Sequence, residues 1–226
     1  MPNQLLNTSM QREVISLHST PLVRVNIGRS FTEKETECIA SIPIKDRKLD
    51  SSNRSIQSSQ SESFNVFDSV KVKEDLKDIK AYCEDEITKY LQGIDGIDTK
   101  FITLQITSSW LNKIKPQEFC DIHNHKNSYL SGIIYFRCLP NDSTLFTNRA
   151  AMSDTTLHFP KSKITEFNAK AVSINVKEGD LLLFPSWVPH QVNVNTTDQD
   201  RVSLSFDTWP IQIPPFDPSL NETSDE

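Results

Sequence analysis

Apolar residues in the first half of the chain recur at the spacing of a helix. From Asp68 onward they are separated by three or four positions: Val72, Leu76, Ile79, Cys83, Ile87 and Leu91. This spacing predicts an amphipathic helix of about 20 residues, whose opposite face is rich in Lys, Glu and Asp. Gly93 and Gly96 follow, which is typical of a helix end. Earlier in the chain, residues 21–27 have the composition of a strand and residues 31–42 the spacing of a helix.

After residue 100 the pattern changes to short segments of β-branched and aromatic residues separated by turn residues, which is typical of strands. The predicted strands are residues 101–106, 109–114, 119–125, 129–138, 144–147, 164–176, 180–184, 190–194 and 202–207. Because the helical pattern is confined to the first hundred residues, the sequence predicts an α+β fold that is mainly β. It contains a sandwich or barrel of about eight strands.

The composition divides the chain into four regions. Residues 1–20 are predicted to be a poorly structured N-terminus, residues 21–99 a strand and helix support region, residues 100–208 the β core, and residues 209–226 a proline-rich tail. Within the support region, the serine-rich segment 45–63 has almost no apolar residues. Burial therefore cannot offset its loss of conformational entropy, and it is predicted to be a mobile loop.

Length and charge narrow the classes of protein. The 226 residues suffice for one domain with a sizeable core. The formal net charge of -6 weighs against extended nucleic-acid binding, and the apolar runs are too short to cross a bilayer. The four cysteines have no C-x-x-C spacing, and the N-terminus lacks the pattern of a signal peptide. We therefore expect a cytoplasmic protein with free thiols.

Two histidine motifs carry the candidate chemistry. His123 and His125 are two positions apart in a predicted strand, so their imidazoles point to the same face and form a metal-binding edge. An H-x-H pair also arises by chance on an exposed strand, and the pair alone leaves both interpretations open. The second motif, residues 177–190, contains a Gly-Asp turn, an apolar strand and a proline-flanked loop that ends at His190.

An arginine follows these histidines. Arg201 comes eleven residues after His190 and begins an alternating strand, in which it shares a face with Ser203. A metal beside a fixed guanidinium suits a chelating ligand with an anionic far end, because the planar guanidinium pairs with a carboxylate through two hydrogen bonds and stays charged when buried.

Taken together, these motifs resemble the 2-oxoglutarate and Fe(II)-dependent oxygenase superfamily, and most closely the putative oxygenases of bacteria and phages. Those proteins share a motif like H-x-H-x-x-S-x-x-S-G-x-Y-Y. The matching motifs all lie within residues 100–208. The N-terminal half resembles the superfamily only in the order of its predicted elements. The matching residues are His123-x-His125, Ser131-Gly-Ile-Ile-Tyr-Phe136, Gly179-Asp-Leu-Leu-Leu-Phe-Pro-Ser-Trp187, His190 and Arg201-x-Ser203.

The resemblance implies a double-stranded β-helix (a cupin-like jelly roll) with N-terminal helices packed against it, and non-haem Fe(II) at its mouth. The enzyme would hydroxylate a primary substrate with O2 while 2-oxoglutarate is decarboxylated to succinate, with ascorbate as a candidate reductant. By position, His123 and His190 match metal ligands. Arg201 and Ser203 match the residues that hold the far carboxylate of 2-oxoglutarate, and Asn112 matches a further position that contacts this cosubstrate. A phage-encoded protein of this kind would act in the host cytoplasm.

The chain departs from the superfamily at one ligand. A carboxylate usually stands two residues after the first histidine, which gives two histidines and one carboxylate. Here that position is His125, which we predict to be the third metal ligand. Asp121 has the same strand parity and is the alternative.

Two other functions remain open from the sequence. One is a cupin-like dioxygenase that uses three histidines without 2-oxoglutarate, and the other is a non-catalytic jelly-roll binding protein. Arg201 favours the oxygenase, because the cupin hypothesis gives no reason for an arginine at that position. The resemblance also gives segment 45–63 a second interpretation, as a lid over the substrate. The sequence identifies neither the primary substrate nor the oligomeric state.

Overall fold

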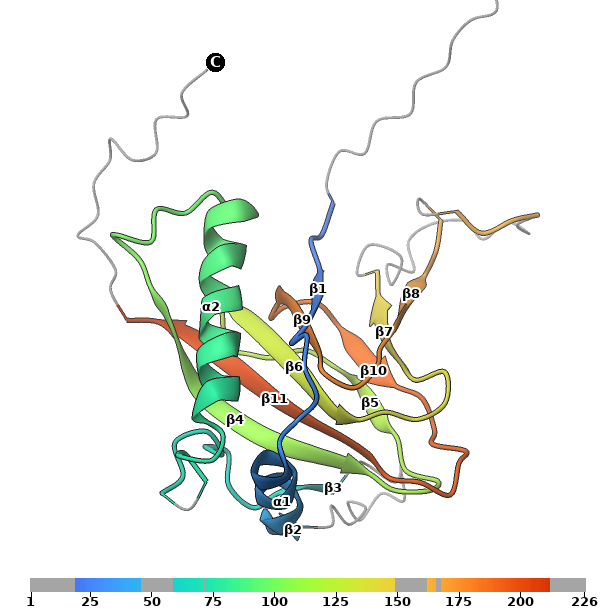
Figure 1. Ribbon diagram of the computed structural model, residues 1–226. Helices are drawn as coiled ribbons and strands as arrows, with labels where there is room; N and C mark the ends of the chain where they lie inside the picture. The colour runs from blue at the N-terminus through green and yellow to red at the C-terminus, as the bar shows by residue number, and fades with distance from the viewer. Residues whose placement is uncertain (1–18, 46–58, 71, 149–161, 166–167, 212–226) are drawn as a thin grey trace, which may run out of the picture.

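Two antiparallel sheets form the body of the protein in the computed structural model (Figure 1). The structure describes residues 19–45, 59–70, 72–148, 162–165 and 168–211. The larger sheet has seven strands in the order β1-β9-β6-β11-β4-β3-β2, and the smaller has four in the order β5-β10-β7-β8. The strands are β1 (Val23–Asn26), β2 (Ile44–Lys45), β3 (Ser59–Ser61), β4 (Leu104–Ile114), β5 (Cys120–His123), β6 (Leu130–Arg137), β7 (Ser143–Thr147), β8 (Ala171–Asn175), β9 (Asp180–Pro185), β10 (His190–Val192) and β11 (Arg201–Pro210).

Strand β9 shows how the core is divided. Its side chains alternate between the two faces of the larger sheet, and all four central residues are apolar and fully buried. Leu181 and Leu183 pack on the helix side, whereas Leu182 and Phe184 pack with Phe146 of the smaller sheet. The larger sheet is therefore covered on one face by helices and on the other by the second sheet.

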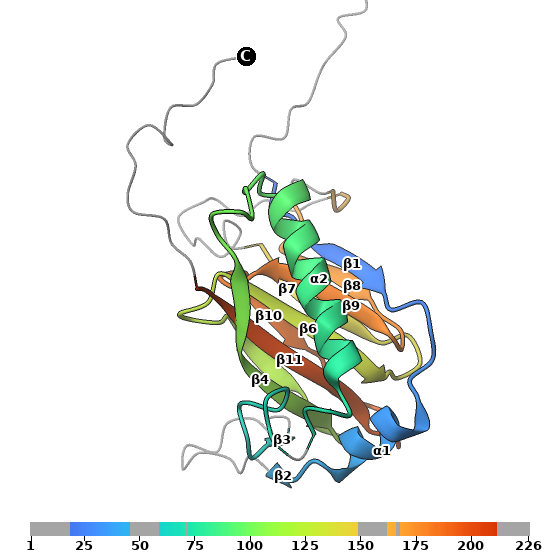
Figure 2. The ribbon, with the colours of Figure 1, turned by 60° about the vertical axis from the view of Figure 1, so that its left-hand side comes forward.

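Helices α1 (Glu33–Ser41) and α2 (Lys77–Gly93) cover the outer face of the larger sheet (Figures 1 and 2). Helix α1 begins with a capping box, in which the Thr32 hydroxyl accepts from the Glu35 N–H and the Glu35 carboxylate accepts from the Thr32 N–H. Helix α2 buries the apolar stripe predicted from the sequence, including Ile79, Cys83 and Ile87. The predicted mainly β jelly-roll fold with N-terminal helices packed against it is confirmed.

Several predicted boundaries differ from the observed ones. From residue 104 onward, the predicted strands 101–106 and 109–114 form one continuous strand, β4, because Ser108 and Ser109 at their junction pair with β11 instead of turning. The long predicted strand 164–176 contains only the short strand β8 among its described residues. The predicted helix begins at Lys77, later than expected, because residues 72–76 form turns that still bury Val72 and Leu76.

The prediction of a mobile loop over residues 45–63 was wrong at both ends of this range. Lys45 lies in β2 and Ser59–Ser61 forms β3, which pairs with β2 on one side and with β4 on the other. Ser61 is buried, accepts a hydrogen bond from Leu111 N–H and donates one to the Ser63 carbonyl. Sheet and hydroxyl hydrogen bonds thus stabilise residues 59–61, although their low apolar content alone predicts no ordered structure. Residues 46–58, most of residues 1–20 and nearly all of the tail lie outside the described residues.

Strand β11 brings the candidate residues together. It pairs with β4 on one side and β6 on the other, and Ser203 stands opposite Asn112 in this register. Alternation along the strand points Arg201, Ser203, Ser205 and Asp207 to the same face, the inner face that looks toward the smaller sheet. In the described part of the chain, no helix has the length and apolar character needed to cross a membrane.

Gly132 on β6 lies against an aromatic ring. A Cβ atom added at Gly132 would lie 2.1 Å from Cζ of Phe206. We expect Gly132→Ala to lower the free energy of unfolding by about 2 to 3 kcal/mol, because the packed sheet cannot move this ring without strain. Urea unfolding measures the change. Gly93→Ala is the control, since an added Cβ there meets nothing within 4 Å, and equal stability loss in both variants would contradict the packing explanation.

Candidate metal and cosubstrate site

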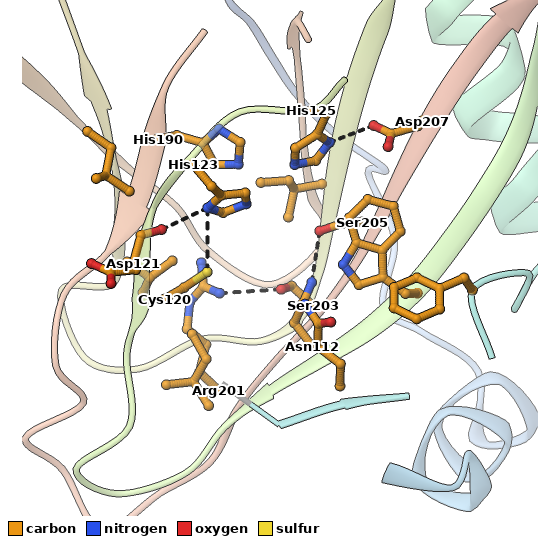
Figure 3. A pocket seen from close by; sticks show the side chains of 17 residues that line it. Asn112, Cys120, Asp121, His123, His125, His190, Arg201, Ser203, Ser205 and Asp207 are labelled. Atoms are coloured by element: carbon orange, nitrogen blue, oxygen red, sulfur yellow. Dashed lines mark hydrogen bonds and ion pairs between the residues drawn. The ribbon is translucent and has the colours of Figure 1, made fainter. Parts of the chain in front are cut away.

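Three histidines converge at one end of the space between the sheets (Figure 3). Strands β5 and β10 pair so that His123 stands directly opposite His190. His125 follows β5, where its backbone N–H donates to the Ser186 carbonyl. One ligand atom from each histidine lies within 4.8 Å of those of the other two. Among the described residues, the sequence-predicted metal ligands therefore form a single group of the size that one metal ion needs.

Hydrogen bonds set the tautomer of two of these imidazoles. Nδ1 of His123 lies 2.8 Å from the Asp121 carbonyl, and Nδ1 of His190 lies 3.1 Å from the Val188 carbonyl. A carbonyl oxygen only accepts hydrogen bonds, so each Nδ1 carries the proton. Each Nε2 therefore keeps its lone pair, which is the form that binds a metal.

His125 is held differently. Its Nδ1 lies 2.5 Å from Oδ1 of Asp207, and its Nε2 is buried without a hydrogen-bond partner in the described part of the chain. A buried acceptor left unpaired costs free energy. A metal bound by Nε2 would satisfy it, so this orphaned atom fits a metal site.

Asp121, the alternative third ligand, is not part of the group of three histidines found among the described residues. Its backbone carbonyl supports His123, while its side chain is exposed at the rim of the cavity. His125 therefore stays our prediction for the third ligand.

Burial controls the charge of His190. This side chain is 3% exposed. Burial, together with the smaller effect of the neighbouring His123 and His125, lowers its pKa from 6.5 to about 3. The buried imidazole is therefore neutral and able to bind a metal across the physiological pH range.

The same shift makes the stability of the metal-free protein depend on pH. The unfolded chain binds a proton at His190 below pH 6.5, the ordinary pKa, whereas the folded protein does not until about pH 3. We expect the free energy of unfolding to fall as the pH decreases between these values, by at most about 1.4 kcal/mol per pH unit from this group. Urea unfolding at pH 7.5 and pH 5 measures the fall. It should be smaller in His190→Gln, and an equal fall in both proteins would contradict the assignment to His190.

Arg201 lies in the same cavity and is 2% exposed. Its Nε donates to both carboxylate oxygens of Asp142, at 3.1 and 2.9 Å, and its terminal nitrogens donate to Thr144 Oγ1 and Ser203 Oγ. Its Cζ lies 4.9 Å from the ring centroid of Tyr135. Burial alone would lower the pKa of Arg201, but Tyr135 and Asp142 outweigh it, so the net shift is upward and the guanidinium stays charged.

The guanidinium keeps donors for a ligand. Of its five N–H groups, one on each terminal nitrogen has no partner among the described residues. Two N–H groups on one planar fork match the two oxygens of a carboxylate. Asp142 and Thr144 therefore fix Arg201 in place without using up its capacity to bind an anion.

The cavity has a volume of about 420 Å³, within the usual range for small-molecule sites. Asn112 lies in its wall, accepts from Gln60 Nε2 and donates to Ser205 Oγ, each at 2.9 Å. Oε1 of Gln60 is buried without a partner in the described residues. The lining also includes the predicted residues His123, His125, His190, Arg201, Ser203 and Asn112, together with Phe64, Trp110, Ile122, Ile133, Val192 and Asp207.

Sequence reasoning missed several residues of the site. Asp207 has the same strand parity as Arg201 and Ser203, and this signal was sufficient to include it. Asp142 and Thr144 come from a different part of the sequence, and no spacing connects them to Arg201. Gln60 lies on β3, inside the segment predicted to be a loop.

The fold and the site define a class: a jelly-roll protein with three converging histidines and a buried arginine in one cavity. Within that class, residues 108–207 match the family described as putative 2OG-Fe(II) oxygenase. The predicted resemblance to the 2-oxoglutarate and Fe(II)-dependent oxygenase superfamily is confirmed. No curated protein sequence matches the chain significantly.

Solved structures with similar folds cover most of the chain. The non-heme alpha ketoglutarate dependent carbocyclase SnoK from nogalamycin biosynthesis is 14% identical, with a TM-score of 0.58 over 91% of this chain and 87% of that one. A Trichoplax adhaerens prolyl hydroxylase in complex with a hypoxia inducible factor peptide is 16% identical, with a TM-score of 0.55 over 83% of each chain. HygX from Streptomyces hygroscopicus, with nickel and 2-oxoglutarate bound, is 11% identical, with a TM-score of 0.52 over 85% and 84%. At these identities the similarity shows the fold alone.

Proposed function

We propose that this protein is a non-haem iron oxygenase that couples the oxidative decarboxylation of 2-oxoglutarate to the hydroxylation of a primary substrate. The observation that carries the proposal is one cavity that holds both three converging imidazoles and a buried arginine with unused N–H donors. The family match and the 2-oxoglutarate bound to HygX support it. Ascorbate is the candidate reductant.

Each residue has a role in this proposal. His123, His125 and His190 hold Fe(II), which when bound supplies the activation of O2 and of the 2-oxo acid. Arg201 binds the far carboxylate of 2-oxoglutarate, and Ser203, which accepts from Arg201, keeps the guanidinium oriented. The charged fork thereby fixes the direction in which the cosubstrate enters the cavity.

The remaining walls of the cavity protect and position the ligands. The Trp110 ring lies 5.3 Å from the His125 ring and 6.1 Å from the Phe64 ring, between centroids. Trp110, which is 9% exposed, thereby shields the histidines from water on the β4 side of the cavity. Asn112 keeps one N–H after its bonds to Gln60 and Ser205, and we propose that it donates this hydrogen to the cosubstrate.

Anaerobic titration tests the proposal directly. The purified protein is mixed with Fe(II) and then 2-oxoglutarate without oxygen, and the visible absorbance is recorded. We expect the weak charge-transfer band of a chelated 2-oxo acid, saturating at one equivalent of each. Absence of the band with correctly folded protein would contradict the proposed function.

The three-histidine group specifically favours a second candidate, a cupin-like dioxygenase that does not use 2-oxoglutarate. Oxygen uptake by the Fe(II)-loaded protein separates the two. The proposed function requires uptake that depends on 2-oxoglutarate and yields succinate, and the same succinate assay with a metabolite library identifies the primary substrate. Substrate-dependent uptake without 2-oxoglutarate would instead establish the cupin-like reaction, and no uptake and no band would leave a non-catalytic binding protein.

A further inference from the structure

The structure assigns Asp207 a positioning role: it supplies, through His125, the negative charge that a carboxylate ligand would otherwise give the metal directly. This inference rests on the proposed function, because it concerns the same metal centre. It explains how a histidine can stand at the ligand position where the superfamily usually has a carboxylate.

The backbone of β11 directs the Asp207 side chain toward His125. Its Oδ1 lies 2.5 Å from Nδ1 of His125, and the two side chains are 17% and 6% exposed. The register of β11 against β4 shifts between Asp207 and Thr208. Irregularities of this kind re-aim a side chain at the edge of a site. Figure 3 shows the carboxylate on the side of the His125 ring that faces away from the other two histidines.

A serine holds both partners of this contact. Ser131, opposite Asp207 on β6, donates from Oγ to the same Oδ1 atom at 2.6 Å and lies 3.0 Å from Nδ1 of His125. The Ser131 hydroxyl also lies 2.7 Å from that of Ser186, whose carbonyl accepts from the His125 backbone N–H. Oδ1 of Asp207 is therefore held by contacts with both His125 and Ser131, which fixes the carboxylate as the orienting group of a metal ligand.

The three histidines differ in what supports them. Nδ1 of His123 and Nδ1 of His190 face neutral backbone carbonyls, whereas Nδ1 of His125 faces a carboxylate. A carboxylate that accepts the Nδ1 proton makes Nε2 a stronger electron donor and fixes the plane of the ring. Three neutral imidazoles alone would leave the full charge of a divalent ion uncompensated. Asp207 places one negative charge next to the ligand set without occupying a coordination position.

Metal titration of Asp207 variants tests this role. Co(II) serves as the probe, because its visible spectrum reports on ligand strength and its affinity is measured without turnover. We expect Asp207→Ala to weaken Co(II) binding by about 10- to 100-fold. Asp207→Asn keeps an acceptor for Nδ1–H but loses the charge, so it should weaken binding less and shift the Co(II) absorption bands. Asp200→Asn, at the surface before β11 and paired with Lys113, is the matched control and should change neither quantity.

The outcomes separate this inference from the proposed function. If the wild-type protein binds neither Co(II) nor Fe(II), the proposed function fails and the role of Asp207 fails with it. If the wild-type protein binds metal and both Asp207 variants match it in affinity and spectrum, only the role of Asp207 is overturned. If His125→Ala retains wild-type affinity while the Asp207 variants lose it, Asp207 is itself a ligand and the inference is again wrong. Circular dichroism confirms folding, and Asp207→Asn, which preserves shape, covers the case in which Asp207→Ala does not fold.

Discussion

Replacement of His123 by alanine is expected to weaken Fe(II) or Co(II) binding by at least about 100-fold, because it removes one of three side-chain ligands. The change should leave the fold intact, since His123 is exposed on the short strand β5 and contributes no apolar core. Calorimetric titration of the metal measures the affinity, and thermal unfolding of the metal-free protein checks the fold.

Asp121→Asn is the matched control for this variant. Asp121 lies on the same strand, two residues before His123, and is the alternative carboxylate ligand. We expect this control to bind metal as the wild-type protein does, because its side chain is not part of the group of converging ligand atoms in the described residues. A large loss of affinity in Asp121→Asn, with little change in His125→Ala, would establish Asp121 as the third ligand.

The second large effect is expected from Arg201→Lys, which should raise the Kd for 2-oxoglutarate by about 100-fold in the presence of metal. Lysine keeps the positive charge but loses the planar fork, and a hydrogen bond to a charged group contributes about 1.5 to 3 kcal/mol. The metal affinity itself should stay unchanged, because Arg201 is not among the converging ligands. The strength of the charge-transfer band as a function of 2-oxoglutarate concentration measures the effect.

Lysine is preferred to alanine at this position because Arg201 is paired with buried Asp142. Arg201→Ala would leave that carboxylate buried and unpaired, at a cost of about 3 to 5 kcal/mol, and would confuse loss of fold with loss of binding. Arg137→Lys on β6 is the control, since Arg137 is exposed and lies outside the histidine cavity. Unchanged 2-oxoglutarate affinity in Arg201→Lys would remove Arg201 from the cosubstrate site.

The sequence predicts those parts of the fold that follow from local periodicity. The apolar stripe of α2 and the short strands after residue 100 are visible because alternation and helical spacing leave a direct signal in the residue order. His123 and His125 were found together for the same reason, since two positions in a strand define one face. His190 and Arg201 were singled out by their own motifs, but their roles beside that face required the resemblance to a family, because nothing local places them near it.

Other features depend on pairing between distant segments, which no local pattern of residues reveals. Asp142 meets Arg201 only after β7 and β11 have packed face to face, and Gln60 meets Asn112 only after β3 has joined β4. The same holds for residues 59–61, in which sheet hydrogen bonds replace apolar burial. Such contacts become predictable only once strand order and register are known.

The bond between His125 and Asp207 joins the two halves of the sandwich. His125 follows β5 of the smaller sheet, whereas Asp207 belongs to β11 of the larger one. An ion held by the three histidines is thereby connected to the larger sheet through the contacts of His125 with Asp207 and Ser131, and links the two layers. Metal binding and the stability of this packing are consequently linked: an ion that binds only the packed arrangement of the two sheets must also stabilise it. Protection of the β5 and β10 amides from hydrogen exchange should therefore rise with metal occupancy.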